Sequence, residues 1–253
     1  MRVLGISGSL RRDSQNTALL RHVGDIFEAA GAEFELYDGL RDVPPYDEDC
    51  DTERAPEAVS RLREAVRDAD ALFFVTPEYN SSIPGALKNA LDWISRPFAT
   101  NVLRYKPVAV IGVSSGAFGA VWAQAELRKV LGAIGARVSE GEVAVGNAAE
   151  RVDENGRLTE PNLEQEVREV IAALLADAGP AHTSPYAADS ATPGPSGEAG
   201  PERPPAAGEH AERDVHPAER AYTAELARAT PNGRPRGRTE TAQISRDDPK
   251  RTD

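Results

Sequence analysis

A loop near the start of this chain of 253 residues carries side chains suited to binding an anion. Hydroxyls, an amide and a guanidinium surround a predicted helix start, at Ser9, Arg11, Ser14, Asn16 and Thr17. Free N–H groups and the helix dipole favour an anion there, and arginine can make paired hydrogen bonds to a phosphate. The loop has neither the ending of a P-loop nor a GxGxxG spacing. We therefore predict a phosphate site, with helix capping by Ser14 or Asn16 as the alternative interpretation.

Two further loops place polar residues directly after short apolar runs. The run 71–76 is followed by Pro77, Glu78, Tyr79 and Asn80, and the run 107–113 by Ser114, Ser115 and Gly116. A similar run, 3–6, precedes the loop with Arg11. Continuous apolar runs are typical of strands buried on both faces of a parallel sheet. Because ligands bind at the carboxyl ends of such strands, we expect the three loops to share one site.

Helical and extended patterns alternate through the first 177 residues. Apolar residues recur at helical spacing within 17–30, 59–66, 84–93, 123–134 and 163–175, and extended patterns occupy 3–6, 33–37, 71–76, 107–113 and 137–145. This alternation predicts a five-stranded parallel sheet with helices on both faces, joined by right-handed crossovers. Gly31 is predicted to end the first helix, and Pro84 to lie in the first turn of the third.

Composition changes sharply near residue 178. Residues 178–253 hold 11 of the 19 prolines, and Val215, Leu226 and Ile244 are the only valine, leucine and isoleucine there. Such a segment buries too little apolar surface to offset its ordering entropy. We therefore predict a globular domain over 1–177 and a disordered tail over 178–253, with a short helix at 217–229 as the only element in the tail.

The net charge and the scarcity of histidine and cysteine exclude several classes of function. The formal net charge is −12, and the tail holds 10 Lys and Arg against 12 Asp and Glu, which leaves −10 for the domain. That balance argues against general nucleic-acid binding. His22 is the only histidine of the domain and Cys50 the only cysteine of the chain. Intrachain disulfides, cysteine metal sites and a histidine-based hydrolase or metal site are therefore not expected, and the difficult chemistry falls to a cofactor.

The sequence also predicts where in the cell the protein acts. The chain shows neither the apolar core of a signal peptide nor a run long enough to span a membrane. With a single cysteine, this favours a cytoplasmic protein without membrane partners.

Four segments together resemble the NADPH-dependent FMN reductase family, which includes quinone, chromate and azo-dye reductases. They read GSLRRDSQNT, PPYDED, TPEYNSSIPGALKNALDWISRP and SSGAFGA, and the resemblance covers residues 1–177. It implies a flavodoxin-like three-layer α/β/α sandwich. It also implies roles for the three loops: Ser9, Arg11, Ser14, Asn16 and Thr17 would hold the FMN phosphate, Pro77, Glu78, Tyr79 and Asn80 would lie beside the isoalloxazine and ribityl chain, and Ser114, Ser115 and Gly116 would line the other side of the ring.

The resemblance further implies an activity and an assembly. An enzyme of this kind passes hydride from NADPH or NADH through FMN to a small acceptor such as a quinone, free flavin, azo compound or chromate. No single residue is implied to be the catalytic group. Homodimers or homotetramers are implied, with the loop around Tyr46 close to the flavin and to the subunit contact.

Two other functions fit parts of the pattern. A flavodoxin-like electron carrier would share the fold and FMN but would not oxidise NAD(P)H. A non-flavin α/β module could bind a nucleotide or another phosphorylated ligand and act as a regulator. Fold alone does not separate these functions, because one fold hosts many activities.

Overall fold

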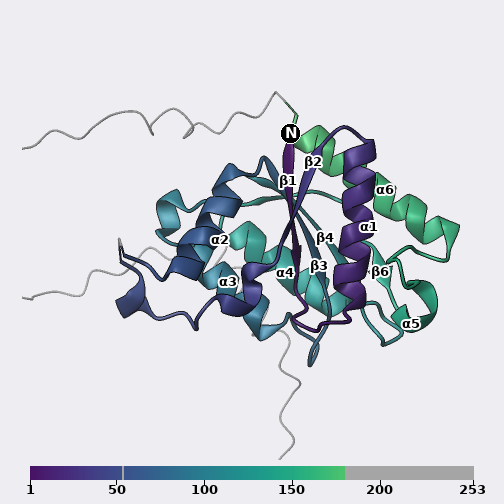
Figure 1. The fold of residues 1–253 in the computed structure, drawn as a ribbon, viewed down its shortest axis with the longest axis horizontal. Coiled ribbons are helices and arrows are strands. Elements are labelled where there is room, and N and C mark those ends of the chain that lie inside the picture. Colours follow the sequence, from purple (N-terminus) through teal and green to yellow (C-terminus); the bar gives the residue numbers. More distant parts are fainter. Residues whose placement is uncertain (53, 180–253) are drawn as a thin grey trace, which may run out of the picture. The chain divides into compact units, whose positions relative to one another are not determined.

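The computed structural model describes residues 1–52 and 54–179, and these form a parallel sheet covered by helices on both faces (Figure 1). The strands are β1 (Arg2–Ser7), β2 (Glu33–Tyr37), β3 (Ala71–Thr76), β4 (Pro107–Val113), β5 (Arg137–Val138) and β6 (Ala144–Val145). Their order is β2-β1-β3-β4-β5, and β6 also pairs with β4. All five pairings are parallel. The predicted parallel α/β architecture is confirmed.

Two helical layers complete the sandwich. The helix α1 (Gln15–Ala29) and the helix α6 (Pro161–Asp177) bury apolar residues on one face of the sheet. The helices α2 (Glu57–Asp68), α3 (Gly85–Ile94) and α4 (Val121–Ala133) cover the other face. Figure 1 shows α1 and α6 together on one side, and α2 and α3 on the other. Every residue of β3 and β4 is buried, as expected for central strands between two helical layers.

Helix ends follow the capping residues of the sequence. Ser14 is the N-cap of α1, and Gly31 follows its C-terminus with φ of 83°, a left-handed conformation that glycine adopts without strain. Helix α3 begins at Gly85, one residue later than predicted, so Pro84 is its N-cap rather than a residue of its first turn. The short helices η1 (Gly39–Asp42), η2 (Glu48–Cys50), η3 (Phe98–Thr100) and α5 (Ala148–Arg151) fill connections.

The predicted strand over 137–145 is wrong in its middle. The segment leaves the sheet between β5 and β6, where Gly141 has φ of 102°. Arg128 of α4 bonds into the gap: its guanidinium donates to the carbonyl oxygens of Ser139 and Val110, both at 2.9 Å, and to that of Gly141. One partly buried cation thus replaces the backbone donors that a continuous strand would offer to β4.

The predicted tail and its helix at 217–229 lie outside the described residues, apart from Ala178 and Gly179. Among the residues that are described, no helix has the length and apolar content to cross a bilayer.

Candidate functional site

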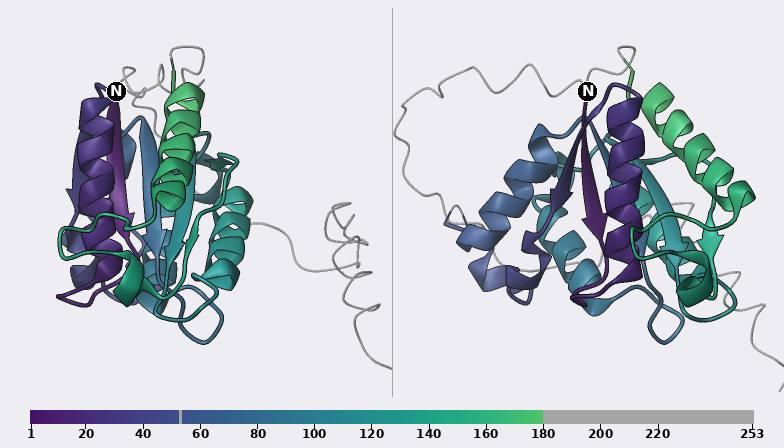
Figure 2. Two further views of the ribbon diagram at one scale, coloured as in Figure 1. Left: turned by 90° about the vertical axis from the view of Figure 1, so that its right-hand side faces the viewer. Right: turned by 45° about the vertical axis from the view of Figure 1, so that its right-hand side comes forward.

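The carboxyl ends of β1, β3 and β4 lie at one edge of the sheet. Ser7 pairs with Val75, and Thr76 pairs with Gly112, so the three following loops begin side by side. In both views of Figure 2 the strands run downward from the N-terminus, and these loops gather at the lower edge. Strand order reverses between β1 and β3, and such a switch point is where open α/β sheets bind ligands.

The first and second loops approach each other closely at Gly8. Its N–H donates to the Val75 carbonyl at 2.8 Å. A Cβ at Gly8 would lie 3.1 Å from both Pro77 Cδ and Thr76 Oγ1, which is tighter than ordinary van der Waals contact. Glycine at this position therefore lets the two loops meet.

Hydroxyl groups at the start of α1 bond to one another and to the backbone. Ser14 Oγ accepts from the Thr17 N–H at 3.3 Å, so the predicted capping role of Ser14 is present in the structure. Thr17 Oγ1 and Ser7 Oγ are 2.8 Å apart, which links the helix to the end of β1. Ser9 Oγ accepts from the Arg11 N–H at 3.4 Å.

The N-terminus of α1 keeps donors available for an anion. Within residues 1–52 and 54–179, no acceptor bonds to the backbone N–H of Gln15 or Asn16. Arg11 is exposed beside them, and its guanidinium donates to the Asp13 carbonyl at 2.7 Å. Unpaired N–H groups and the positive end of the helix dipole favour a phosphate at this place.

Asn16 is buried between α1 and β4. Its side-chain Nδ2 donates to the Val113 carbonyl at 3.2 Å, and its Oδ1 is buried with no hydrogen-bond partner in the described part of the chain. A buried polar atom without a partner is costly, and it marks a place where a ligand or water can supply the missing donor.

The second loop contains a tight turn at Tyr79–Ser82. Tyr79 and Ser82 exchange backbone hydrogen bonds of 3.0 and 3.1 Å, while Asn80 and Ser81 have φ of 53° and 59°. Two consecutive positive φ angles are those of a type I′ turn, which is unusual without glycine. The Tyr79 side chain stands out from this turn and is half exposed.

Glu78 bonds to the start of α4. Its Oε2 accepts hydrogen bonds from the backbone N–H groups of Trp122 and Ala123, at 3.1 and 3.2 Å. The sequence interpretation placed Glu78 beside the flavin but did not foresee this contact, since the partners are 44 and 45 residues away.

The third loop is fixed at both of its ends. Ser114 N–H donates to the Val145 carbonyl at 3.0 Å, and Ser114 Oγ accepts from the Gly116 N–H at 3.1 Å. Asn147 N–H donates to the Gly116 carbonyl at 3.0 Å. Ser115 and Gly116 remain exposed at the edge of the sheet.

Asn147 is a site residue that the sequence interpretation missed. It has φ of 48° and lies two residues after the end of β6, with Gly146 between them. A Gly-Asn pair after an extended segment was the available signal, because both residues tolerate the left-handed region.

The loop around Tyr46 is anchored on α3. Tyr46 N–H donates to Asn89 Oδ1 at 2.7 Å, and Trp93 Nε1 donates to the Pro44 carbonyl at 2.8 Å. The Tyr46 and Trp93 rings meet edge to face, with centroids 4.9 Å apart. Arg96 lies over the Tyr46 ring, and the hydrogen bond between them raises the pKa of Arg96 above its ordinary value.

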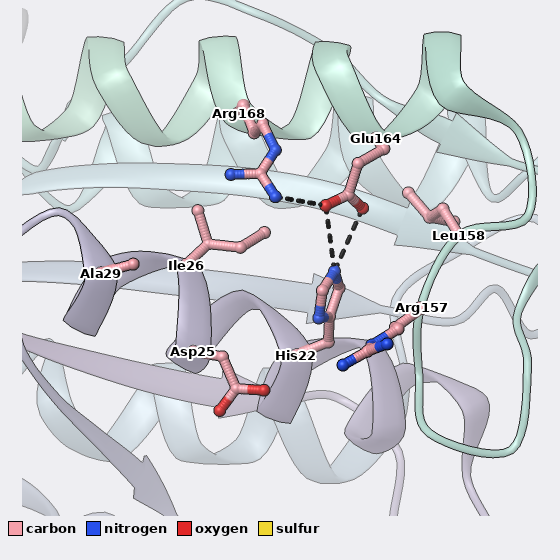
Figure 3. Close-up of a pocket in the computed structure, with 8 residues that line it drawn as sticks. All are labelled: His22, Asp25, Ile26, Ala29, Arg157, Leu158, Glu164 and Arg168. Carbon is pink, nitrogen blue, oxygen red and sulfur yellow. Dashed lines mark hydrogen bonds and ion pairs between the residues drawn. The ribbon is translucent and has the colours of Figure 1, made fainter.

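A separate hollow of about 450 Å³ lies between α1 and α6 (Figure 3). His22 Nε2 lies 3.1 Å from both carboxylate oxygens of Glu164, which also accepts from Arg168 at 2.8 Å. This hollow borders none of the three loops, so we do not assign it to the candidate site. In the part of the chain that the structure describes, no three His, Cys, Asp or Glu side chains are grouped to hold a metal ion.

The strand order and the position of the loops define the class of protein. A 2-1-3-4-5 parallel sheet with ligand loops at its switch point is the flavodoxin-like arrangement. The flavoenzyme NAD(P)H:(acceptor) oxidoreductase FerB from Paracoccus denitrificans is similar in structure, with a TM-score of 0.62 and 34% identity. That similarity covers 70% of this chain and 96% of FerB.

Sequence comparison gives the family. Residues 1–150 match the model of the NADPH-dependent FMN reductase family. The chain is 41% identical over 175 residues to an NAD(P)H-dependent FMN reductase of Pseudomonas aeruginosa, across 69% of this chain and 93% of that protein. It is 38% identical over 159 residues to a 2-hydroxy-1,4-benzoquinone reductase of a Burkholderia species, across 62% and 85%. The chain therefore belongs to the NADPH-dependent FMN reductase family.

Membership confirms the activity and cofactor expected from the sequence. The protein is a flavin-dependent NAD(P)H oxidoreductase that works with FMN and a small-molecule electron acceptor. The comparisons give no support to the electron-carrier alternative.

Proposed function

We propose that the three loops bind FMN, with its phosphate at the N-terminus of α1. The observation that carries this proposal is the pair of N–H groups of Gln15 and Asn16, which have no acceptor among the described residues and lie next to the exposed guanidinium of Arg11. Ser9, Ser14 and Thr17 complete the phosphate-binding loop with hydroxyl groups. The residues present thus fit a phosphate monoester, because they offer hydrogen-bond donors and a positive potential. Among the described residues, no carboxylate is bonded to the start of the helix.

The other two loops would hold the ring. Pro77, Tyr79 and Asn80 would lie along one side of the isoalloxazine and ribityl chain, and Ser114, Ser115 and Gly116 along the other side. Bound FMN supplies hydride acceptance and donation at its ring, which no side chain of this chain offers. The protein contributes proximity, orientation and hydrogen bonds from backbone N–H groups. We assign no catalytic side chain.

The acceptor we propose is a quinone or a similar small oxidant, such as free flavin, an azo compound or chromate. Relatives named as quinone reductases support a quinone as the acceptor. Both NAD(P)H and the acceptor would use the same exposed face of the bound flavin, one after the other. That shared use predicts that the oxidised nicotinamide product, NAD(P)+, leaves before the acceptor binds.

Three proposals concern the whole chain. The reductase domain would span 1–177, since α6 ends at Asp177, and 178–253 would be a tail without a part in flavin binding. The protein would form a homodimer or homotetramer with its flavin close to the subunit contact. It would act in the cytoplasm, where a chain with one free cysteine needs no disulfide.

Initial-rate kinetics of the FMN-loaded protein test the shared site. We expect parallel double-reciprocal lines when NADPH is varied at several fixed concentrations of 1,4-benzoquinone. Intersecting lines would show that both substrates bind at once, which contradicts the shared site. A truncated chain ending at Gly179 should bind FMN as the full chain does, and loss of FMN from that folded truncation would overturn the proposed domain boundary.

A further inference from the structure

The helix α4 begins without a capping side chain of its own. Its N-cap residue is Ala120, which has φ of 64° and no side-chain oxygen. The N–H groups of Trp122 and Ala123 are at the second and third helical positions, where an N-cap side chain normally accepts. Glu78 from the second loop supplies that acceptor with one carboxylate oxygen. The cap of α4 is therefore provided from the loop that follows β3.

A second contact joins the same two elements one turn further along. Ser82 Oγ donates to Glu126 Oε2 of α4. Trp122 and Glu126 are four residues apart, so the second contact lies about one turn beyond the cap. Glu78 and Ser82 in turn flank the turn whose central residues, Asn80 and Ser81, have positive φ. The turn is thus attached to α4 on both sides.

The third loop ends where helix α4 begins. Ala120 is buried, and the Gly119 carbonyl lies 3.5 Å from Gln124 Nε2, so the start of the helix and the end of that loop are packed together. A carboxylate that fixes the start of α4 therefore fixes the second loop relative to the third. Left-handed residues cost about 1 kcal/mol each, and a turn containing two of them needs external support to stay in one conformation.

We infer that Glu78 is a positioning residue that caps α4. Together with the Ser82–Glu126 contact, it fixes the position of the Tyr79–Ser82 turn relative to the loop over 116–120. This inference rests on the proposed function, because those two loops are the ones assigned to the two sides of the flavin. Glu78 would then act on FMN through loop geometry, and its side chain would not touch the ring. A preorganised site loses less entropy on binding and so binds more tightly.

Amide hydrogen exchange of the flavin-free protein tests the cap directly. Glu78→Ala should speed exchange of the Trp122 and Ala123 amides about fivefold, the factor that a cap of about 1 kcal/mol represents. Glu78→Gln keeps an acceptor oxygen and should retain most of the protection. Glu57→Ala, which removes an exposed carboxylate from the first turn of α2, is the matched control and should leave these amides unchanged.

Flavin affinity then tests positioning, by fluorescence titration with FMN. Glu78→Ala should raise the Kd for FMN about five- to tenfold, Glu78→Gln should restore most of the affinity, and Ser82→Ala should weaken it less than Glu78→Ala. A residue with a purely structural role would lower the melting temperature without this pattern of rescue.

Four outcomes would separate the claims. Unchanged Trp122 and Ala123 exchange in Glu78→Ala would overturn the cap. Faster exchange in Glu78→Ala with an unchanged Kd for FMN would overturn the positioning role. FMN affinity of Glu78→Gln as low as that of Glu78→Ala, with normal amide exchange in Glu78→Gln, would also overturn it, because the charge of Glu78 would then act on FMN directly. If the exchange pattern holds but the unsubstituted protein does not bind FMN, the proposed function fails while the cap of α4 stands.

Discussion

The side-chain amide of Asn16 donates to the carbonyl oxygen of Val113 across 3.2 Å. The two residues are 97 positions apart in the chain. This bond joins the first turn of α1 to the last residue of β4, so it connects the loop assigned to the phosphate with the loop assigned to the ring. Asn16 Oδ1 is also buried without a hydrogen-bond partner in residues 1–52 and 54–179, so Asn16 links the fold to the proposed ligand site.

Substitution of Asn16 should affect both stability and flavin binding. Asn16→Ala removes a buried donor and should lower the free energy of unfolding by about 1–2 kcal/mol in urea denaturation. Asn16→Asp places a carboxylate against the Val113 carbonyl and close to the phosphate, and should weaken FMN binding more than Asn16→Ala. Gln15→Ala is the control, because it keeps the backbone N–H and should change little. FMN affinity of Asn16→Asp equal to that of the unsubstituted protein would contradict the assignment.

The phosphate assignment makes a separate prediction for Arg11. Arg11→Ala should weaken FMN about tenfold or more but riboflavin hardly at all, since only FMN carries the phosphate that a guanidinium would pair with. Titration of both ligands into each variant measures this difference. Arg12→Ala, at the exposed neighbouring position, serves as the control and should have a small effect on both. Equal losses for FMN and riboflavin would show that Arg11 is not a phosphate ligand.

Arg128 should be important for stability rather than for chemistry. Arg128→Met leaves the carbonyl oxygens of Val110, Ser139 and Gly141 without their donor, and should lower the free energy of unfolding by about 3 kcal/mol. Arg61→Met is the matched control, because its ion pair with Asp42 is 3.9 Å long and exposed, and it should cost less than about 1 kcal/mol. Similar urea midpoints for the two variants would contradict the role given to Arg128.

Alkaline pH should reveal the environment of Tyr37, at the end of β2. Burial raises the pKa of its phenol, Asp38 and Asp42 add to that effect, and Arg61 opposes it. The folded state therefore keeps this proton longer than the unfolded state does. Its stabilising contribution is complete below the ordinary pKa of about 10 and is lost as pH rises through the folded-state pKa. The stability of the unsubstituted protein should fall more steeply above about pH 10 than that of Tyr37→Phe. Identical slopes of stability against pH for the two proteins would contradict the raised pKa of Tyr37.

Much of the fold was predictable because local signals and tertiary structure agree. The runs at 3–6, 71–76 and 107–113 are apolar apart from Thr76, and they form central strands buried on both faces. Gly31 and Ser14 define the ends of α1 by local backbone and side-chain chemistry. The strand over 137–145 was not predictable in detail, because its interruption depends on a guanidinium from α4 that no local pattern of that segment reveals.

The candidate site shows the same division. The three loops could be recognised from their polar residues after apolar runs, and the sheet does bring them to one edge. The contacts of individual side chains could not be recognised. Glu78 caps a helix 44 residues away, and Asn16 reaches a strand that lies across the sheet, so both depend on the assembled fold. A carboxylate in a ligand loop has the same appearance in sequence whether it faces the ligand or a helix.

An anaerobic visible spectrum of the FMN-loaded protein, recorded before and after addition of NADPH, tests directly whether these loops hold a flavin that NAD(P)H reduces. We expect the visible absorbance of the bound flavin to bleach within the turnover time of the enzyme and to return on addition of 1,4-benzoquinone. A protein that binds FMN without bleaching, or one that binds no FMN at all, would show that the loops do not hold such a flavin.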